Sequence, residues 1–129
     1  MVDELRLALT VQNFDEALAF YRDALGLVML DMWVAPGSKG VILDAGRATL
    51  ELLDEGQAQI VDEIEVGARV AGPVRIALRV ADSVALAEQL EAAGATRLGG
   101  PVETPWQDVN VRLEVPDGMQ LTLFSATGE

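Results

Sequence analysis

Two short apolar runs with nearly the same order of side chains lie 69 residues apart. Leu5 to Val11 (LRLALTV) recurs as Val74 to Val80 (VRIALRV), and each run carries an arginine in second position. An apolar run of about seven residues predicts a β-strand. A fixed spacing between similar segments indicates an internal repeat, so the pattern predicts two tandem modules with Arg6 and Arg75 in equivalent positions.

The residues after the first run predict a βαβββ order for the first module. Asn13 is a suitable N-cap, and apolar residues recur at helical spacing from Phe14 to Leu25. Gly26 can end this helix in a left-handed conformation. Further elements are then predicted in the order strand 27–33, turn 36–38, strand 41–43, hairpin connection 44–47 and strand 48–53.

The second module is predicted to repeat this order. Asp82 or Ser83 can cap a helix that runs from residue 84 to 93 and ends at Gly94. Residues 109–115 alternate apolar side chains with polar ones, which predicts a strand that is buried on one face only. The other predicted elements are strand 73–80, strand 95–98 bent or ended by Gly99-Gly100-Pro101, turn 116–118 and strand 119–124.

The regular order of predicted strands and helices is interrupted between Asp54 and Gly72. We expect one short helical turn there, around Ile60, Val61 and Ile64, within a connector whose acidic stretch from residue 54 to 65 is solvated. The length favours a single domain. Its expected parts are module one at 1–56, the connector at 57–72 and module two at 73–129.

Composition excludes several classes of function. Half of the 129 residues are apolar, so a core can form without disulfides, and the chain has no Cys and no His. Histidine, which is the commonest general base and the commonest transition-metal ligand, is therefore missing. A net charge of −12 disfavours nucleic-acid binding. No apolar run approaches the roughly 18–20 residues of a membrane span, and the acidic start is unlike a signal peptide, so we expect a cytoplasmic protein that does not bind membranes.

Three segments carry a resemblance to a known family. They are residues 17–27 (ALAFYRDALGL), the Pro105-Trp106 pair and residues 115–121 (VPDGMQL). They resemble the helix signature, the "PW" loop and the "DPDG" turn of the glyoxalase / bleomycin-resistance / extradiol dioxygenase (vicinal oxygen chelate) superfamily. The resemblance implies an α+β fold in which two tandem βαβββ modules form a curved, cup-like mixed sheet with helices outside.

Metalloenzymes of that superfamily place His, Glu or Gln ligands on the first and last strand of each module. Carried over to this chain, those four positions hold Arg6, Glu51, Arg75 and Thr122. Only Glu51 suits a divalent cation, and arginine has no acceptor atom and stays protonated in proteins. The departure implies a cavity that uses no metal and no other cofactor.

These same four residues are the predicted floor of a ligand-binding site. The two arginine forks could grip a carboxylate, phosphate or carbonyl group, with Glu51 orienting them. The alternative is a structural network in which Glu51 pairs with Arg6 and Arg75 and fills the vestigial metal site.

Other candidates have both a binding and a structural interpretation. Trp33 and Trp106 are predicted aromatic walls of the cavity that stack on a ligand. The structural alternatives are core filling for Trp33 and loop anchoring for Trp106. Three methionines could line an adaptable pocket, but the core is the stronger expectation for Met29, Met32 and Met119. Solvated surface is expected for the acidic residues around the last hairpin, Glu103, Asp108, Glu114 and Asp117.

The first functional hypothesis is a metal-independent small-molecule binding protein that sequesters its ligand, as an antibiotic-resistance protein does. One alternative is a metal-free lyase or isomerase that uses Glu51 as a base with Arg6 and Arg75. Another is a metal-dependent glyoxalase- or dioxygenase-like enzyme. We also expect a homodimer, because two βαβββ sheets leave exposed edges.

Overall fold

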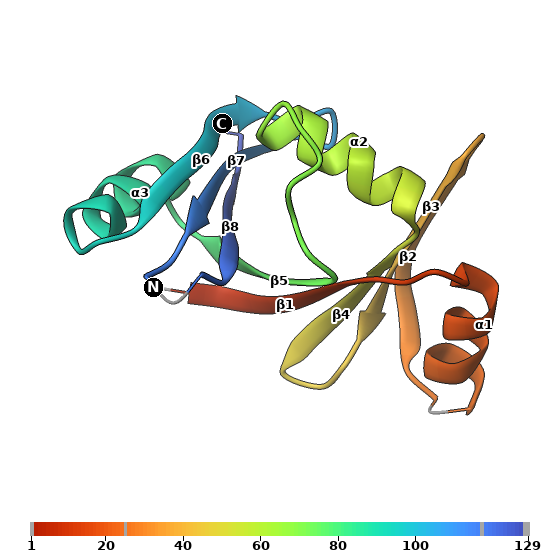
Figure 1. Ribbon diagram of the computed structural model, residues 1–129. Coiled ribbons are helices and arrows are strands. Elements are labelled where there is room, and N and C mark those ends of the chain that lie inside the picture. The colour runs from red at the N-terminus through yellow and green to blue at the C-terminus, as the bar shows by residue number, and fades with distance from the viewer. Residues whose placement is uncertain (1, 25, 117, 128–129) are drawn as a thin grey trace.

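The computed structural model describes residues 2–24, 26–116 and 118–127. Eight strands form one mixed sheet in the order β2-β3-β4-β1-β5-β8-β7-β6 (Figure 1). The first four are β1 (Val2–Thr10), β2 (Val28–Ala35), β3 (Ser38–Asp44) and β4 (Ala48–Leu53). The others are β5 (Val74–Val80), β6 (Thr96–Glu103), β7 (Asp108–Glu114) and β8 (Gln120–Ala126). The helices are α1 (Phe14–Leu18), continued by the π-helix η1 (Ala19–Ala24), α2 (Glu55–Glu65) and α3 (Ser83–Ala92).

The sheet confirms the predicted tandem βαβββ order. Each module places its first strand beside its last, in the parallel pairs β1–β4 and β5–β8, and the modules meet where β1 and β5 run antiparallel. In that ladder Leu7 pairs with Ile76, its counterpart in the sequence repeat. On either side, Arg6 pairs with Ala77 and Ala8 with Arg75. The ladder is therefore symmetric about Leu7 and Ile76, as a local two-fold axis requires.

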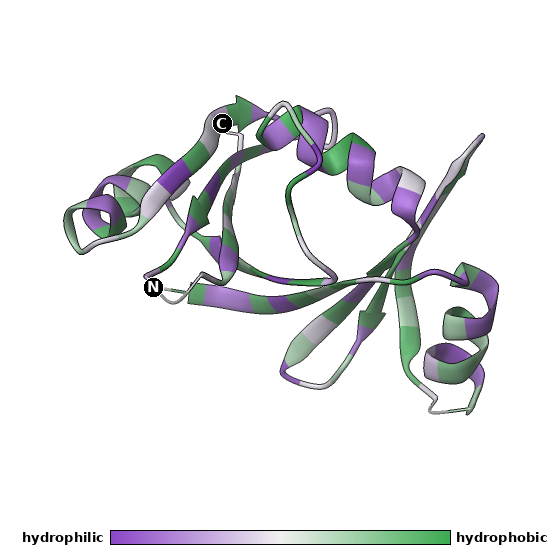
Figure 2. Ribbon diagram, in the orientation of Figure 1, coloured by the Kyte–Doolittle hydropathy of each residue, from purple (hydrophilic) through white to green (hydrophobic). Residues whose placement is uncertain are grey.

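Helices α1 and α3 cover the outer face of the sheet, each over its own module. Phe14 and Leu18 of α1 pack with the outward residues of β3 and β4, and Ala87 of α3 packs with those of β7 and β8. Alternating polar and apolar residues along the strands give the sheet one face for these cores (Figure 2). The predicted caps are confirmed, since Asn13 accepts from the Glu16 amide and Asp82 from the Ala85 amide, each at 3.0 Å.

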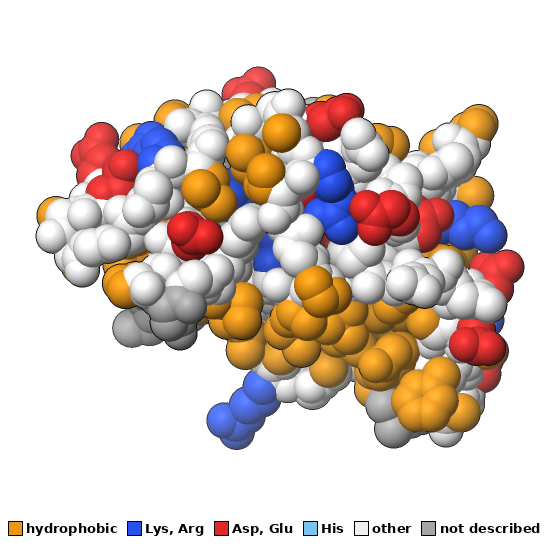
Figure 3. Space-filling view, in the orientation of Figure 1, with side chains coloured by type: hydrophobic (Ala, Val, Ile, Leu, Met, Phe, Trp, Pro, Cys, Tyr) orange, Lys and Arg blue, Asp and Glu red, His pale blue; other side chains and the backbone are white. Residues whose placement is uncertain are grey.

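The outer face of the two central strands is left uncovered. Leu5 and Leu7 of β1 are 44% and 38% exposed, and Val74 of β5 is 38% exposed. Figure 3 shows apolar side chains gathering below β1 and beside α1. This exposed apolar face lies between the two covering helices.

The region between the modules differs from the prediction, because it contains an eleven-residue helix, α2. Its N-cap is Asp54, whose carboxylate accepts from the Gln57 amide at 2.8 Å. The expectation of a solvated connector with one helical turn is wrong. The buried face of α2 is mostly polar and holds Gln57, Ala58, Val61, Asp62 and Glu65, so the sequence shows little apolar periodicity there.

Helix α2 crosses the inner, concave side of the sheet (Figure 1). At its start a Cβ on Gly56 would lie 1.7 Å from the Gly37 carbonyl oxygen of the β2–β3 turn. At its end a Cβ on Gly99 of β6 would lie 2.0 Å from the Glu65 carbonyl oxygen. Glycine at these two positions therefore lets α2 rest on the β2–β3 turn of the first module and on β6 of the second at once.

Other differences are local. The first helix becomes π-helical after Leu18, and Leu25, its predicted last residue, lies outside the described residues, as does Asp117 of the predicted turn. Strand β6 does not end at residue 98 but continues to Glu103, with register shifts against β7 around Gly99. The Gly-Gly-Pro segment therefore bends the strand without ending it.

Candidate functional site

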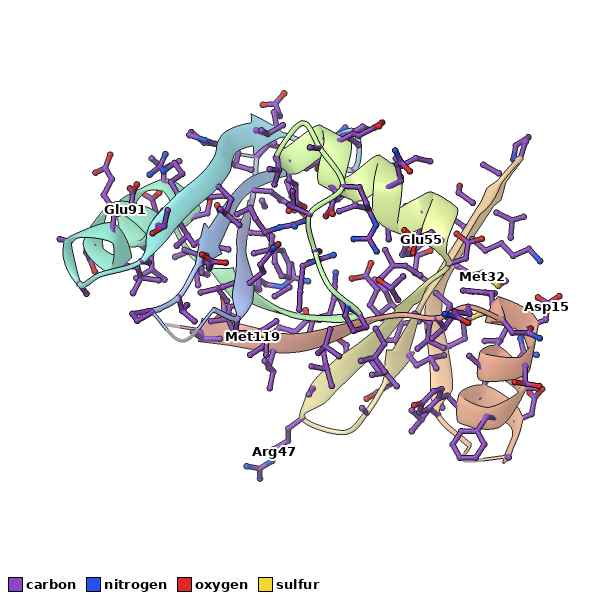
Figure 4. The ribbon with its side chains drawn as sticks, in the orientation of Figure 1. Asp15, Met32, Arg47, Glu55, Glu91 and Met119 are labelled. Atoms are coloured by element: carbon purple, nitrogen blue, oxygen red, sulfur yellow. The ribbon has the colours of Figure 1, made fainter. Side chains whose placement is uncertain are left out.

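A cavity of about 550 Å³ lies between α2 and the concave face of the sheet. Both modules contribute to it, together with α2 and the loop between β6 and β7. All six residues predicted from the sequence line it: Arg6, Trp33, Glu51, Arg75, Trp106 and Thr122. Figure 4 shows side chains from α2 and from the strands below it pointing toward one another, while Arg47 in the β3–β4 hairpin points away from the molecule.

The floor of the cavity is set by strand register. Ala8 of β1 pairs with Glu51 of β4 on one side and with Arg75 of β5 on the other. Next along the sheet, Ala77 of β5 pairs with Thr122 of β8. Because neighbouring residues across a ladder point to the same face, these side chains share the inner face of four adjacent strands.

Arg6 is held at one end of this floor. Its Nη2 lies 3.1 Å from Glu4 Oε2, and its Nε donates to Thr49 Oγ1 at 3.3 Å. Arg79 donates to the other oxygen of the same Glu4 carboxylate at 2.8 Å. Both guanidinium groups lie over the Phe124 ring, 5.0 and 5.2 Å from its centre. Arg6 thus shares the single Glu4 carboxylate with Arg79.

Glu51 and Arg75 are both buried, at 8% and 7% exposure, and the ion-pair network given above as the alternative to a ligand site does not form between them. Arg75 donates from Nη1 to Thr122 Oγ1 at 3.1 Å. Within the described residues, Glu51 makes no hydrogen bond or salt bridge to Arg75 or Arg6. Burial raises the pKa of Glu51, and the positive charges of Arg75 and Arg6 oppose this shift only in part.

The buried ion-pair network lies instead under α2, around Arg112 of β7, which is fully buried. Its Nε donates to Glu65 Oε1 at 2.9 Å and to Thr122 Oγ1 at 3.0 Å. Its Nη1 donates to Asp62 Oδ1 and to Gln120 Oε1, both at 2.9 Å. The expectation that β7 has a solvated face is therefore wrong, as is that of solvation for Asp62 and Glu65.

Asp62 also holds the chain that follows α2. Its Oδ2 accepts from the backbone amides of Val70 at 2.7 Å and Ala71 at 2.8 Å. Burial alone would raise the pKa of Asp62, but these amides and the Arg112 guanidinium outweigh it and hold the pKa below its ordinary value. One carboxylate thus ties α2, the following loop and β7 together.

Aromatic rings form part of the cavity wall. Trp33 lies flat against Gly40, the residue opposite it on β3, where an added Cβ would sit 2.4 Å from the ring. The Trp33 indole N–H is buried and has no partner among the described residues. Trp106, at 44% exposure, lies in the β6–β7 loop at the cavity edge. Both tryptophans thus line the cavity, and their contact with a ligand stays a prediction.

Among the lining residues that were not predicted are three that add polar and aromatic groups to the cavity wall. Asn110 is 4% exposed; its Nδ2 donates to Glu65 Oε2 at 2.8 Å, and its Oδ1 has no partner among the described residues. Asp108, expected on the surface, lines the cavity, and burial raises its pKa. Phe124 completes the wall. The two-residue alternation along β7 was the signal that could have found Asn110, because it stands on the same face of the strand as Arg112.

The remaining sequence candidates lie outside the cavity. Met32 packs against the core of the first module, as expected, whereas Met29 and Met119 are 43% and 37% exposed. Glu103 is exposed, as predicted, and Glu114 is half-buried.

The four positions that hold metal ligands in the resembling enzymes do not fit a metal ion here. Arg75 and Thr122 occupy two of these positions, and Arg75 donates a hydrogen bond to Thr122. The charge of Arg75 also lies close enough to Glu51, at a third position, to oppose the rise of its pKa. A divalent cation there would face a guanidinium group with no acceptor atom. Over residues 2–24, 26–116 and 118–127, no group of three or more Asp, Glu, His or Cys side chains is arranged to hold a metal.

Among the helices that the structure describes, none is long and apolar enough to span a bilayer.

Comparisons with known proteins agree with this architecture. Residues 5–123 match the family model of the Glyoxalase/Bleomycin resistance protein/Dioxygenase superfamily. A hypothetical protein from Bacillus halodurans C-125 is similar in structure, with 20% identity and a TM-score of 0.69 over 100% of this chain and 96% of that one. No curated protein gives a significant match.

Two further similar structures are methylmalonyl-CoA epimerases. The enzyme from Mycobacterium tuberculosis has 18% identity and a TM-score of 0.65 over 98% of this chain and 88% of its own. A Streptomyces coelicolor epimerase in complex with 2-nitronate-propionyl-CoA has 22% identity and a TM-score of 0.65, over 98% of this chain and 97% of that one. At such identities the likeness shows a shared fold.

Proposed function

Because this chain belongs to the Glyoxalase/Bleomycin resistance protein/Dioxygenase superfamily, we propose that it is a metal-independent small-molecule binding protein that sequesters its ligand, as an antibiotic-resistance protein does. The observation that carries the proposal is the cavity of about 550 Å³ with aromatic walls and a few polar groups at its floor. Cavities of this size and character accept drug-sized molecules. Arg6, Arg75 and Thr122 occupy positions where a metalloenzyme would need ligands.

The proposed ligand-binding residues are those at the floor and walls of the cavity. The polar groups would orient the ligand and the two indole rings would stack on its flat parts. The binding set is Arg6, Glu51, Arg75, Thr122, Trp33 and Trp106.

Tryptophan fluorescence tests this function directly, because the chain has two tryptophans and both line the cavity. A broad panel of drug-like and metabolite-like compounds is titrated, with a thermal-shift measurement in parallel. Saturable quenching that is unchanged by EDTA, and reduced in Trp33→Phe or Trp106→Phe, supports metal-independent binding. Elemental analysis that finds one tightly bound transition metal per chain, or binding abolished by EDTA, contradicts it.

A second candidate is a metal-free lyase or isomerase that uses Glu51 with Arg6 and Arg75. The observation in its favour is the buried Glu51 carboxyl, whose raised pKa suits a proton-transferring group beside a cation that can stabilise an oxyanion. Methylmalonyl-CoA is a reasonable first substrate to assay, with and without added divalent metal. Turnover that Glu51→Gln abolishes would favour this enzyme over a binding protein.

We further infer that the protein is a cytoplasmic homodimer. The exposed apolar face on β1 and β5 contains Leu5, Leu7 and Val74 and is centred on the local two-fold axis. A face of this kind can pair with a second copy of itself.

A further inference from the structure

Glu51 and Arg75 flank a gap in the cavity floor. Both are the direct neighbours of Ala8, one on each side, so their backbones lie two strand spacings apart, about 10 Å. The residue between them contributes only a methyl group. A carboxylate and a guanidinium therefore stand on either side of a small apolar platform, without touching each other.

Both charged groups are short of hydrogen-bond partners. In the part of the chain that the structure describes, the Glu51 carboxylate has no hydrogen bond or salt bridge, and Arg75 uses one N–H, on Thr122. Buried charges of this kind are costly unless they are paired and hydrogen-bonded. The neighbouring charges relieve this cost only in part, because Arg6 is paired with Glu4 and Glu65 with Arg112.

Resting on the binding function proposed above, we propose that the Glu51–Arg75 gap holds a neutral ligand group that donates one hydrogen bond and accepts another, such as a primary carboxamide. Its N–H would donate to the Glu51 carboxylate, and its C=O would accept from the free N–H groups of Arg75. An anionic group is opposed by Glu51 and a cationic group by Arg75, so the pair selects against both charges.

Two other cavity groups favour the same ligand chemistry. The Asn110 Oδ1 acceptor and the Trp33 indole donor are both buried and have no partner among the described residues. Asn110 Oδ1 needs a hydrogen-bond donor, and the Trp33 indole N–H needs an acceptor. The N–H and the C=O of an amide provide these two groups. The class of ligand is therefore a neutral, flat compound bearing an amide, with its ring against Trp33 or Trp106.

The test compares three probes of the same shape and different charge, namely benzamide, benzoate and benzamidine, by tryptophan fluorescence at pH 8. For the wild-type protein we expect benzamide to bind about tenfold more tightly than either charged probe, because like-charge contacts are costly in a water-poor site. Glu51→Gln should improve benzoate binding about tenfold and so remove this selectivity. Arg75→Met should improve benzamidine binding and weaken that of benzamide. Glu88→Gln, on the exposed side of α3, is the matched control and should change nothing.

Tightest binding of benzoate or benzamidine to the wild type would overturn the proposal, as would three probes that all fail to saturate. The wild-type comparison decides the matter even if a variant does not fold, which circular dichroism would reveal. The broader binding function fails separately, if the full compound panel also yields no ligand.

Discussion

Arg112 of β7 and Asp62 of α2 form an ion pair with 2.9 Å between Nη1 and Oδ1, at side-chain exposures of 0% and 2%. The two residues are 50 positions apart in the sequence. Their contact fastens the helix over the cavity to the sheet below it. The roof of the cavity therefore depends on a buried polar contact, with Glu65 and Thr122 as further partners of the same guanidinium.

Replacing Arg112 by Met is expected to lower the free energy of unfolding by about 3–5 kcal/mol, since it leaves the Glu65 carboxylate buried without its cation and Asp62 with only the part-exposed Arg69 as a partner cation. Urea denaturation measures the loss. Arg47→Met, at the exposed hairpin, is the matched control and should stay within about 0.5 kcal/mol of the wild type. Equal stability of the two variants would show that Arg112 does not hold α2.

The burial of Asp62 and Glu65 against Arg112 also explains which parts of the molecule could be predicted from the sequence. The repeat made the two-module sheet predictable, with Arg6 and Arg75 at equivalent positions, and the family resemblance pointed to Glu51 and Thr122, which strand register places on the same face. Helix α2 was missed because its buried face carries Asp62 and Glu65. The pattern of polar and apolar positions predicts that such residues are exposed to solvent. In the fold, an arginine that is distant in sequence pairs with them and makes their burial possible. The Asp54 to Gln57 spacing, a capping-box pattern, was the local signal available.

Glu51→Gln is expected to stabilise the protein at pH 7 and to change its stability little near pH 4. The pKa of Glu51 is raised above 4.5 in the folded state, so the folded protein binds this proton more tightly than the unfolded chain does. The favourable contribution is complete below about pH 4.5 and is lost as the pH rises through the folded-state pKa.

Urea denaturation of wild type and Glu51→Gln at several pH values between these limits measures the difference. Glu88→Gln should show no such trend. A Glu51→Gln variant that is less stable than the wild type at pH 7 would indicate that Glu51 is ionised and well paired in the fold, contrary to the contacts described above.

Gly40→Ala is expected to displace the Trp33 ring, because the added Cβ would lie 2.4 Å from it. Overpacking of this kind costs about 1–3 kcal/mol. The displaced ring should also narrow the cavity, so any ligand found by fluorescence should bind more weakly and the Trp33 emission should shift. Gly72→Ala, where no atom lies within 4 Å of the added Cβ, is the control and should be tolerated. Unchanged emission and affinity in Gly40→Ala would show that Trp33 is not positioned by this close contact.

The last prediction concerns assembly through the exposed apolar face of β1 and β5. Light scattering at micromolar concentration is expected to give twice the 13.8 kDa mass of one chain. Leu7→Glu should convert the protein to a monomer, because Leu7 stands at the centre of that face beside Ile76 and the two-fold symmetry would bring two such charges together. Ile60→Glu changes an equally exposed apolar residue on α2 and should leave the mass at that of a dimer. A monomeric wild type would refute the dimer. A dimer that withstands Leu7→Glu would place the interface elsewhere, at β2 or β6. These are the two edge strands of the sheet, and their outer edges could pair with a second copy.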